Sequence, residues 1–224
     1  MLISYQKRFI FVHVPKVAGS SIRDAIQRYA YRPDMYLWNR VLRKLGLRAR
    51  LPASPIYSLS THSTAGEAKH HLPSEVFAGF FKFAFVRNPW DHLVSKYHFI
   101  LKRPPHRHYE IVRTLSCFRD YVRWLEENPG EALHGALQKY FVTDHSGQML
   151  VDFLGRYENL QDDFQTACRR VGIHATLPHV NVSKHDDYRA YFDSETIDVV
   201  GRLFAPDIKF FGYDFDGVRK GEAA

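Results

Sequence analysis

The chain has 224 residues, of which 45% are hydrophobic, 15% aromatic and 25% charged, a composition that excludes disordered, collagen-like and low-complexity proteins. Its 31 Lys and Arg against 24 Asp and Glu give a formal charge of +7, which indicates an anionic partner without saying which anion. The length suits a single domain over residues 1–224, because no linker-like stretch divides it.

The segments that would mark export or membrane insertion are missing from the sequence. No stretch reaches the ~20 consecutive apolar residues that span a bilayer, and Met1–Arg8 lacks the charged-then-apolar order of a signal peptide. The two cysteines, Cys117 and Cys168, have no second thiol nearby, which argues against a disulfide framework and CxxC chemistry. We therefore expect a cytoplasmic protein with no transmembrane segment.

Strands and helices are expected to alternate from the first residues onward. Phe9–Val14 is an aromatic and β-branched run typical of a strand buried on both faces. After the loop Lys16–Ser20, apolar residues recur at helical spacing from about Ser21. Two further strands are expected at Tyr57–Ser60 and Phe81–Val86.

The remaining predicted elements repeat this order. Helices are expected at Trp90–Leu101, from Phe118 to the break at Asn128-Pro129-Gly130, and at Ser194–Phe204. A strand at Phe153–Tyr157 is followed by a helix that ends at Gly172. Strands alternating with helices predict an α/β fold with a central parallel sheet flanked by helices.

The loop Pro15-Lys16-Val17-Ala18-Gly19-Ser20-Ser21, between the first strand and the first helix, predicts an anion site. Small residues let the backbone wrap closely, and the unpaired N–H groups of the first helical turn point into the loop. Gly19 permits an unusual φ, Ser20 and Ser21 add hydroxyl donors, and Lys16 adds a positive charge. The alternative to an anion site is a purely structural turn of small residues with an N-capping serine.

A second candidate anion site follows the strand Phe81–Val86, where the chain reads Arg87-Asn88-Pro89-Trp90-Asp91-His92-Leu93-Val94-Ser95. A turn at Asn88-Pro89 would let the Arg87 guanidinium and the Ser95 hydroxyl bind one phosphate. Alternatively, Arg87 satisfies nearby carbonyls and Ser95 is a buried helix hydroxyl. Neither loop has the lysine after glycine of an ATP-binding P-loop or the acid that helps hold Mg²⁺.

As a pair, the two loops resemble the 5′-phosphosulfate and 3′-phosphate motifs of sulfotransferases that use 3′-phosphoadenosine 5′-phosphosulfate (PAPS), and the carbohydrate sulfotransferase type most closely. Segments similar to that type also occur at Gly155–Leu160, Leu177–Lys184 and Ile208–Tyr213, so the resemblance extends over residues 8–215. It implies a P-loop-like nucleotide-binding fold and transfer of a sulfuryl group to an acceptor hydroxyl. By family likeness a sugar is the first candidate acceptor, and a lipid-linked sugar, a small alcohol or a secondary metabolite fits the same residues.

The resemblance also implies roles for individual residues. The 5′-phosphosulfate is assigned to Lys16 and the loop residues Ala18, Gly19, Ser20 and Ser21, and the 3′-phosphate to Arg87 and Ser95. Asn181, Ser183 and Lys184 would close over the nucleotide, and Tyr188 or Phe192 would contact the adenine. Lys16 would neutralise charge on the departing oxygen during an in-line transfer that needs no metal.

The candidate general base is His62, in Ser60-Thr61-His62-Ser63-Thr64, where related enzymes often place a histidine. Glu67 and His13 are the next candidates, and with 13 histidines in the chain a structural role for any one of them stays open. His106-Arg107-His108 suggests a metal only weakly, because no third ligand accompanies it.

Two other functions remain open at this point. A kinase with a degenerate P-loop would bind Mg-ATP, and a non-catalytic module would bind nucleic acid or acidic glycans through a basic stripe. The basic residues within 32–55 are either a solvated segment or the rim of an anion site. We expect no nucleic-acid partner, because the basic residues at the two strand ends have a better-defined task.

Overall fold

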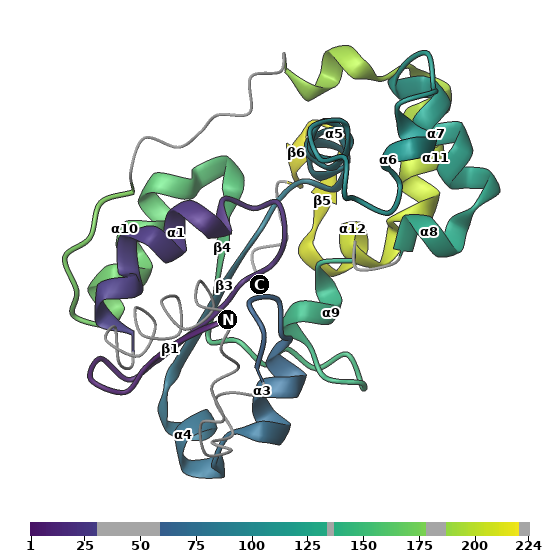
Figure 1. Cartoon of the computed structure of the whole chain (residues 1–224). Helices are drawn as coiled ribbons and strands as arrows, with labels where there is room; N and C mark the ends of the chain where they lie inside the picture. The colour runs from purple at the N-terminus through teal and green to yellow at the C-terminus, as the bar shows by residue number, and fades with distance from the viewer. Residues whose placement is uncertain (31–58, 134–136, 178–186, 220–224) are drawn as a thin grey trace, which may run out of the picture. The chain divides into compact units, whose positions relative to one another are not determined.

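The computed structural model describes residues 1–30, 59–133, 137–177 and 187–219. The chain divides into two compact units, one formed by Met1–Phe85 and Tyr140–Val180 and the other by Val86–Lys139 and Asn181–Ala224. Each unit is described separately below, with its elements labelled as in Figure 1. The prediction of a single domain over residues 1–224 stays a prediction.

A four-stranded sheet organises the first unit, in the order β1-β2-β3-β4. The strands are β1 (Leu2–Ser4), β2 (Phe9–Val12), β3 (Phe81–Val86) and β4 (Phe153–Arg156). β2 and β3 are parallel, with Phe9 opposite Phe81 and Val12 opposite Ala84, so both strands end at the same edge of the sheet. All of β2 is fully buried, as its unbroken apolar run predicts.

The edge strand β1 was not expected from the sequence and runs antiparallel to β2. The predicted α/β architecture with a parallel pair at the centre of the sheet is confirmed, and β1 adds an antiparallel edge that makes the sheet mixed. The three residues of β1 are too few to show a hydrophobic periodicity in the sequence. The turn at Tyr5–Arg8 connects β1 to β2. The expected strand at Tyr57–Ser60 is not observed at Leu59 and Ser60, and its first two residues lie outside the described part of the chain.

Five helices and two 3-10 turns are described in the first unit. The helix that follows β2 starts at Gly19, two residues before the expected start near Ser21. The helices are α1 (Gly19–Ile26), α3 (Ala65–His71), α4 (Ser74–Gly79), α9 (Lys139–Val142, whose first residue belongs to the second unit) and α10 (Leu160–Arg170), with 3-10 turns at Gln27–Tyr29 and Tyr157–Asn159. After α10, Gly172 adopts the left-handed φ of 62°, which confirms it as the terminating residue.

The second unit is a set of helices around one apolar cluster. They are α5 (Pro89–Leu101), α6 (Tyr109–Val112), α7 (Phe118–Glu127), α8 (Pro129–Leu133), α11 (Ser194–Leu203) and α12 (Ala205–Phe211), with a 3-10 turn at Tyr188–Tyr191 and a hairpin of β5 (Tyr213–Asp214) and β6 (Gly217–Val218). Leu93, Tyr121 and Val200 are fully buried at its centre. Within the described ranges, no helix is both long and apolar enough to cross a membrane.

Candidate functional site

The loop between β2 and α1 has a strained backbone. Lys16 (φ 65°) and Ala18 (φ 59°) both take positive φ values, which non-glycine residues seldom adopt and which concentrate at functional sites. Left-handed residues that alternate with ordinary ones turn successive N–H groups toward one point and form a concave anion site. Ala18 is the N-cap of α1 and offers no side-chain acceptor, and the first turn of α1 has no acidic residue. The geometry of this loop therefore suits an anion.

Gly19 is required by packing, which corrects the expectation that it supplies an unusual φ. The positive φ values belong to Lys16 and Ala18 instead. A Cβ at Gly19 would lie 2.0 Å from Cδ2 and 2.1 Å from Nε2 of His13, whose ring stacks on Phe11 with centroids 5.8 Å apart. The absence of a side chain at Gly19 thus lets His13 pack directly under the first turn of α1.

His62 lies against the end of β2, next to His13. Its Nδ1 is 3.2 Å from the backbone oxygen of His13, and the centroids of the two rings are 4.7 Å apart. Because a carbonyl oxygen only accepts hydrogen bonds, Nδ1 carries the proton in this contact, and Nε2 of the neutral ring keeps its lone pair. The structure therefore brings His62, His13 and Gly19 together and gives exposed His62 the tautomer of a base.

His13 itself is only 5% exposed, and its surroundings keep it neutral. Burial lowers the pKa of His13 to about 3, with smaller contributions from the charges of His62, the N-terminal amine and Arg23. Its Nδ1 atom is buried and has no hydrogen-bond partner among the residues that the structure describes. A ring that stays uncharged is poorly suited to accept a proton, which makes His13 a weaker candidate base than His62.

The low pKa of His13 predicts acid destabilisation. An unfolded histidine titrates at its ordinary value of 6.5, whereas the folded one titrates at about 3, so between these values the unfolded chain binds more protons. The stabilisation is complete above about pH 6.5 and is lost as the pH falls, by about 2 kcal/mol at about pH 5. Urea unfolding of wild type and of His13→Gln at about pH 6.5 and at about pH 5 measures this loss of stability. The variant should lose less stability than wild type; equal losses would contradict the assignment.

In the second unit, the buried Arg87 side chain forms a two-pronged ion pair with a carboxylate that the sequence interpretation did not include. Nε and Nη2 of Arg87 donate to the two carboxylate oxygens of Asp91 at 2.6 and 2.7 Å. The backbone of Arg87 exchanges hydrogen bonds of 2.8 and 2.7 Å with the Gln138 side-chain amide. The ion pair with Asp91 uses two of the five guanidinium N–H groups and fixes the plane of the Arg87 guanidinium.

Ser95 lies two turns further along α5 and is 5% exposed. The structure thus shows two buried polar side chains at the start and middle of the segment that follows β3. Their expected shared role on a phosphate stays a prediction. A signal for Asp91 was present in the sequence, since Asp91 follows Arg87 at the i,i+4 spacing of many ion pairs, although Arg87 itself precedes α5.

The comparisons with known proteins give the family. A model described as the sulfotransferase family matches residues 1–214, nearly the whole chain. The chain belongs to the sulfotransferase family. An uncharacterized protein of Archaeoglobus fulgidus is 28% identical over 124 residues, which cover 54% of this chain and 92% of that protein. No solved structure matches.

In this sulfotransferase, Glu67 has a structural task at the start of α3. Thr64 Oγ1 accepts from the Glu67 N–H at 3.0 Å, and the Glu67 carboxylate accepts from the Thr64 N–H at 2.9 Å, which is a reciprocal capping box. The carboxylate is therefore occupied at the helix end, and this favours His62 over Glu67 as the base.

The other predicted site residues of the sulfotransferase lie elsewhere in the chain. Asn181, Ser183 and Lys184 lie outside the described residues, as does the whole basic segment at 32–55. Tyr188 and Phe192 both pack on Phe215, with ring centroids 5.6 Å apart in each case. Over the described ranges, no group of three or more His, Cys, Asp or Glu is arranged to hold a metal ion.

Proposed function

We propose that this sulfotransferase transfers the sulfuryl group of PAPS to a hydroxyl of a carbohydrate or glycoconjugate. The observation that carries the proposal is the loop at Lys16–Ser20, whose two left-handed residues suit an anion, with a base-like histidine beside the strand that leads into it. An anion site and a proton acceptor at one strand end are what sulfuryl transfer to a hydroxyl requires.

The 5′-phosphosulfate is assigned to the loop after β2. The N–H groups of Ala18, Gly19, Ser20 and Ser21 would donate to its oxygens, since the N-terminus of a helix favours negative charge. Ser20 is exposed and Ser21 half-buried, so their hydroxyl groups are accessible to a ligand. Lys16 would lie closest to the oxygen that links phosphorus and sulfur, where negative charge develops as the bond breaks.

The 3′-phosphate is assigned to Arg87 and Ser95, with Asn181, Ser183 and Lys184 closing over the nucleotide. The ion pair between Arg87 and Asp91 supports a binding role, because it holds the guanidinium in one orientation before any ligand arrives. Asp91 is thereby proposed as a positioning residue for Arg87.

In the proposed reaction, the acceptor oxygen attacks sulfur and forms a new S–O bond. The bond from sulfur to the bridging oxygen breaks, and its electron pair leaves on the 5′-phosphate of 3′-phosphoadenosine 5′-phosphate (PAP). The proton of the acceptor hydroxyl passes to Nε2 of His62, whose Nδ1 proton is held by the His13 carbonyl. The transfer is proposed to need no metal, and a cytoplasmic location stays a prediction.

Thermal stabilisation distinguishes this function from ATP-dependent phosphoryl transfer. A ligand that binds the folded state stabilises it, and PAP at 100 times its Kd should raise the melting temperature by about 5–10 °C. Mg-ATP, which lacks the 3′-phosphate, should give a much smaller shift at the same concentration. A larger shift with Mg-ATP than with PAP would overturn the proposed function.

A further inference from the structure

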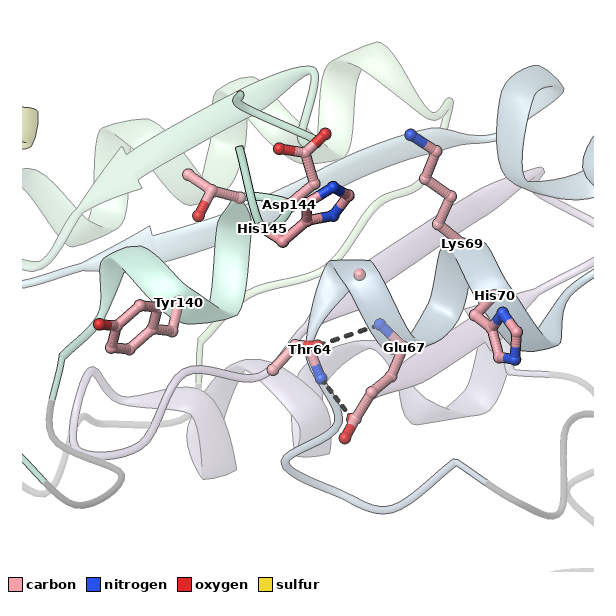
Figure 2. Close-up of a pocket in the computed structure, with 9 residues that line it drawn as sticks. Thr64, Glu67, Lys69, His70, Tyr140, Asp144 and His145 are labelled. Carbon is pink, nitrogen blue, oxygen red and sulfur yellow. Dashed lines mark hydrogen bonds between the residues drawn. The ribbon is translucent and has the colours of Figure 1, made fainter. Parts of the chain in front are cut away.

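A cavity of about 580 Å³ opens in the first unit over helix α3 (Figure 2). One wall is α3 with its N-cap, and the other is formed by Tyr140 of α9 and the turn that follows this helix. The cavity is within the usual size range of small-ligand sites, ~300–1,000 Å³. Its lining residues are Thr64, Gly66, Glu67, Lys69, His70, Tyr140, Thr143, Asp144 and His145.

The turn that carries Asp144 and His145 is internally braced. Thr143 and Met149 form an antiparallel bridge, and Oδ1 of Asp144 accepts from Ser146 N, Ser146 Oγ and Gln148 N at 2.9, 2.6 and 3.0 Å. These bonds leave Oδ2 of Asp144 with no hydrogen-bond partner in the part of the chain that the structure describes. Asp144 is therefore held in place with one oxygen available as an acceptor.

The cavity lining carries one ammonium, Lys69, and two carboxylates, Glu67 and Asp144. In Figure 2 the Lys69 side chain rises from α3 toward the side on which Asp144 and His145 lie, whereas Glu67 points to its hydrogen bond with Thr64. Hydrogen bonds from Ser146 are the main cause of the lowered pKa of Asp144, and the Lys69 ammonium adds to it across the cavity. With Glu67 turned to the helix end, a ligand of either charge would meet one like-charged group, Lys69 or Asp144, in the cavity.

Tyr140 adds a flat apolar surface beside the charged side chains of the cavity. It is 64% exposed, the most exposed of the large hydrophobic side chains in the described ranges, and it faces solvent although large aromatic groups are usually covered. An aromatic ring beside an ammonium and a carboxylate is suited to a molecule with one apolar face and several hydroxyl groups at its edge.

We propose that this cavity binds the acceptor of the proposed sulfuryl transfer, and that the acceptor group bound here is an uncharged, polyhydroxylated ring such as a neutral sugar. Tyr140 stacks on the ring, while Lys69 and Asp144 bind neighbouring hydroxyl groups as donor and acceptor. The inference rests on the proposed function. The cavity begins at Thr64, whose Cα is at most about 7.6 Å from that of His62, because two peptide units separate them.

Three probes that differ mainly in charge test the inference: methyl glucoside, methyl glucuronide and methyl glucosaminide. NMR titration of the full chain saturated with PAP should show that the neutral glycoside binds about tenfold or more tightly than either charged one. Tyr140→Ala should weaken the neutral glycoside about tenfold. Lys102→Met, at an exposed lysine outside the cavity, is the matched control and should change nothing.

Lys69→Met tests the charge preference among the three glycosides, which would not change if Lys69 had only a structural role. It leaves the Asp144 carboxylate uncompensated, so the preference should shift from the neutral glycoside toward the cationic glucosaminide. The inference is overturned if no glycoside binds, if the three bind equally, or if Tyr140→Ala has no effect. A PAP-induced rise in melting temperature without glycoside binding would refute only this inference. Glycoside binding without a PAP effect would refute the proposed function and leave the sugar site standing.

Discussion

Replacing His62 with glutamine is expected to slow sulfuryl transfer by about 10²–10⁴-fold, the usual contribution of a positioned general base. Glutamine keeps a donor for the His13 carbonyl, which His62 contacts at 3.2 Å, but it has no basic nitrogen. The measurement is kcat with PAPS and a saturating acceptor. The matched control is His174→Gln, at an exposed histidine of the same unit, which should transfer at the wild-type rate.

The pH dependence separates a chemical role of His62 from a structural one. Wild-type kcat should fall on the acidic side as the base becomes protonated, and this limb should be absent in His62→Gln. A variant that keeps both its rate and its acidic limb would remove His62 from the mechanism and return attention to other groups at the end of β2.

Replacing Lys16 with methionine should lower kcat by about 10²–10³-fold, similar to the loss of one donor that stabilises transition-state charge. Methionine has nearly the length of lysine and places the same kind of side chain on a backbone with φ 65°, so the strain of the loop is little changed. The affinity for PAP should fall much less than kcat, because most of the ligand is bound by other groups. The comparison of kcat with the Kd for PAP measures this split.

Lys16→Arg provides the control for charge at that position. It should recover part of the lost rate because it restores a cation, although a guanidinium differs in shape and reach from an ammonium. If methionine and lysine support equal turnover, Lys16 has no role in charge neutralisation at the leaving oxygen.

The sequence predicted those features that depend on local pattern. The strand Phe81–Val86 is confirmed with the same bounds, and the expected helix at Trp90–Leu101 begins one residue earlier, at Pro89. Unbroken apolar runs and 3.6-residue spacing are strong signals, and Asn88-Pro89 marks a helix start because Asn caps and Pro occupies the first turn. The loop that follows β2 was also found, from its small residues and position.

The features that were missed depend on side-chain contacts and backbone conformation that no local sequence pattern encodes. The place of Gly19 is set by the His13 ring, six residues earlier, and the tautomer of His62 is set by a carbonyl 49 residues away in sequence. The left-handed φ values fall on Lys16 and Ala18 instead of on glycine, against the usual propensity, so no sequence rule finds them. The cavity combines α3 with Tyr140 and Asp144, which no motif joins.

The claim at the centre of this account is that the chain binds a nucleotide through a 3′-phosphate held by Arg87. Calorimetric titration of PAP and of adenosine 5′-phosphate, which lacks that group, tests it most directly in wild type, Arg87→Ala and Arg87→Lys. Because removing one partner of a buried ion pair destabilises a fold by about 3–5 kcal/mol, Arg87→Lys keeps a cation for Asp91 in case the alanine variant fails to fold. Wild type should bind PAP at least about tenfold more tightly than adenosine 5′-phosphate, with the preference reduced in the variants. Equal affinity of wild type for the two nucleotides would contradict the account.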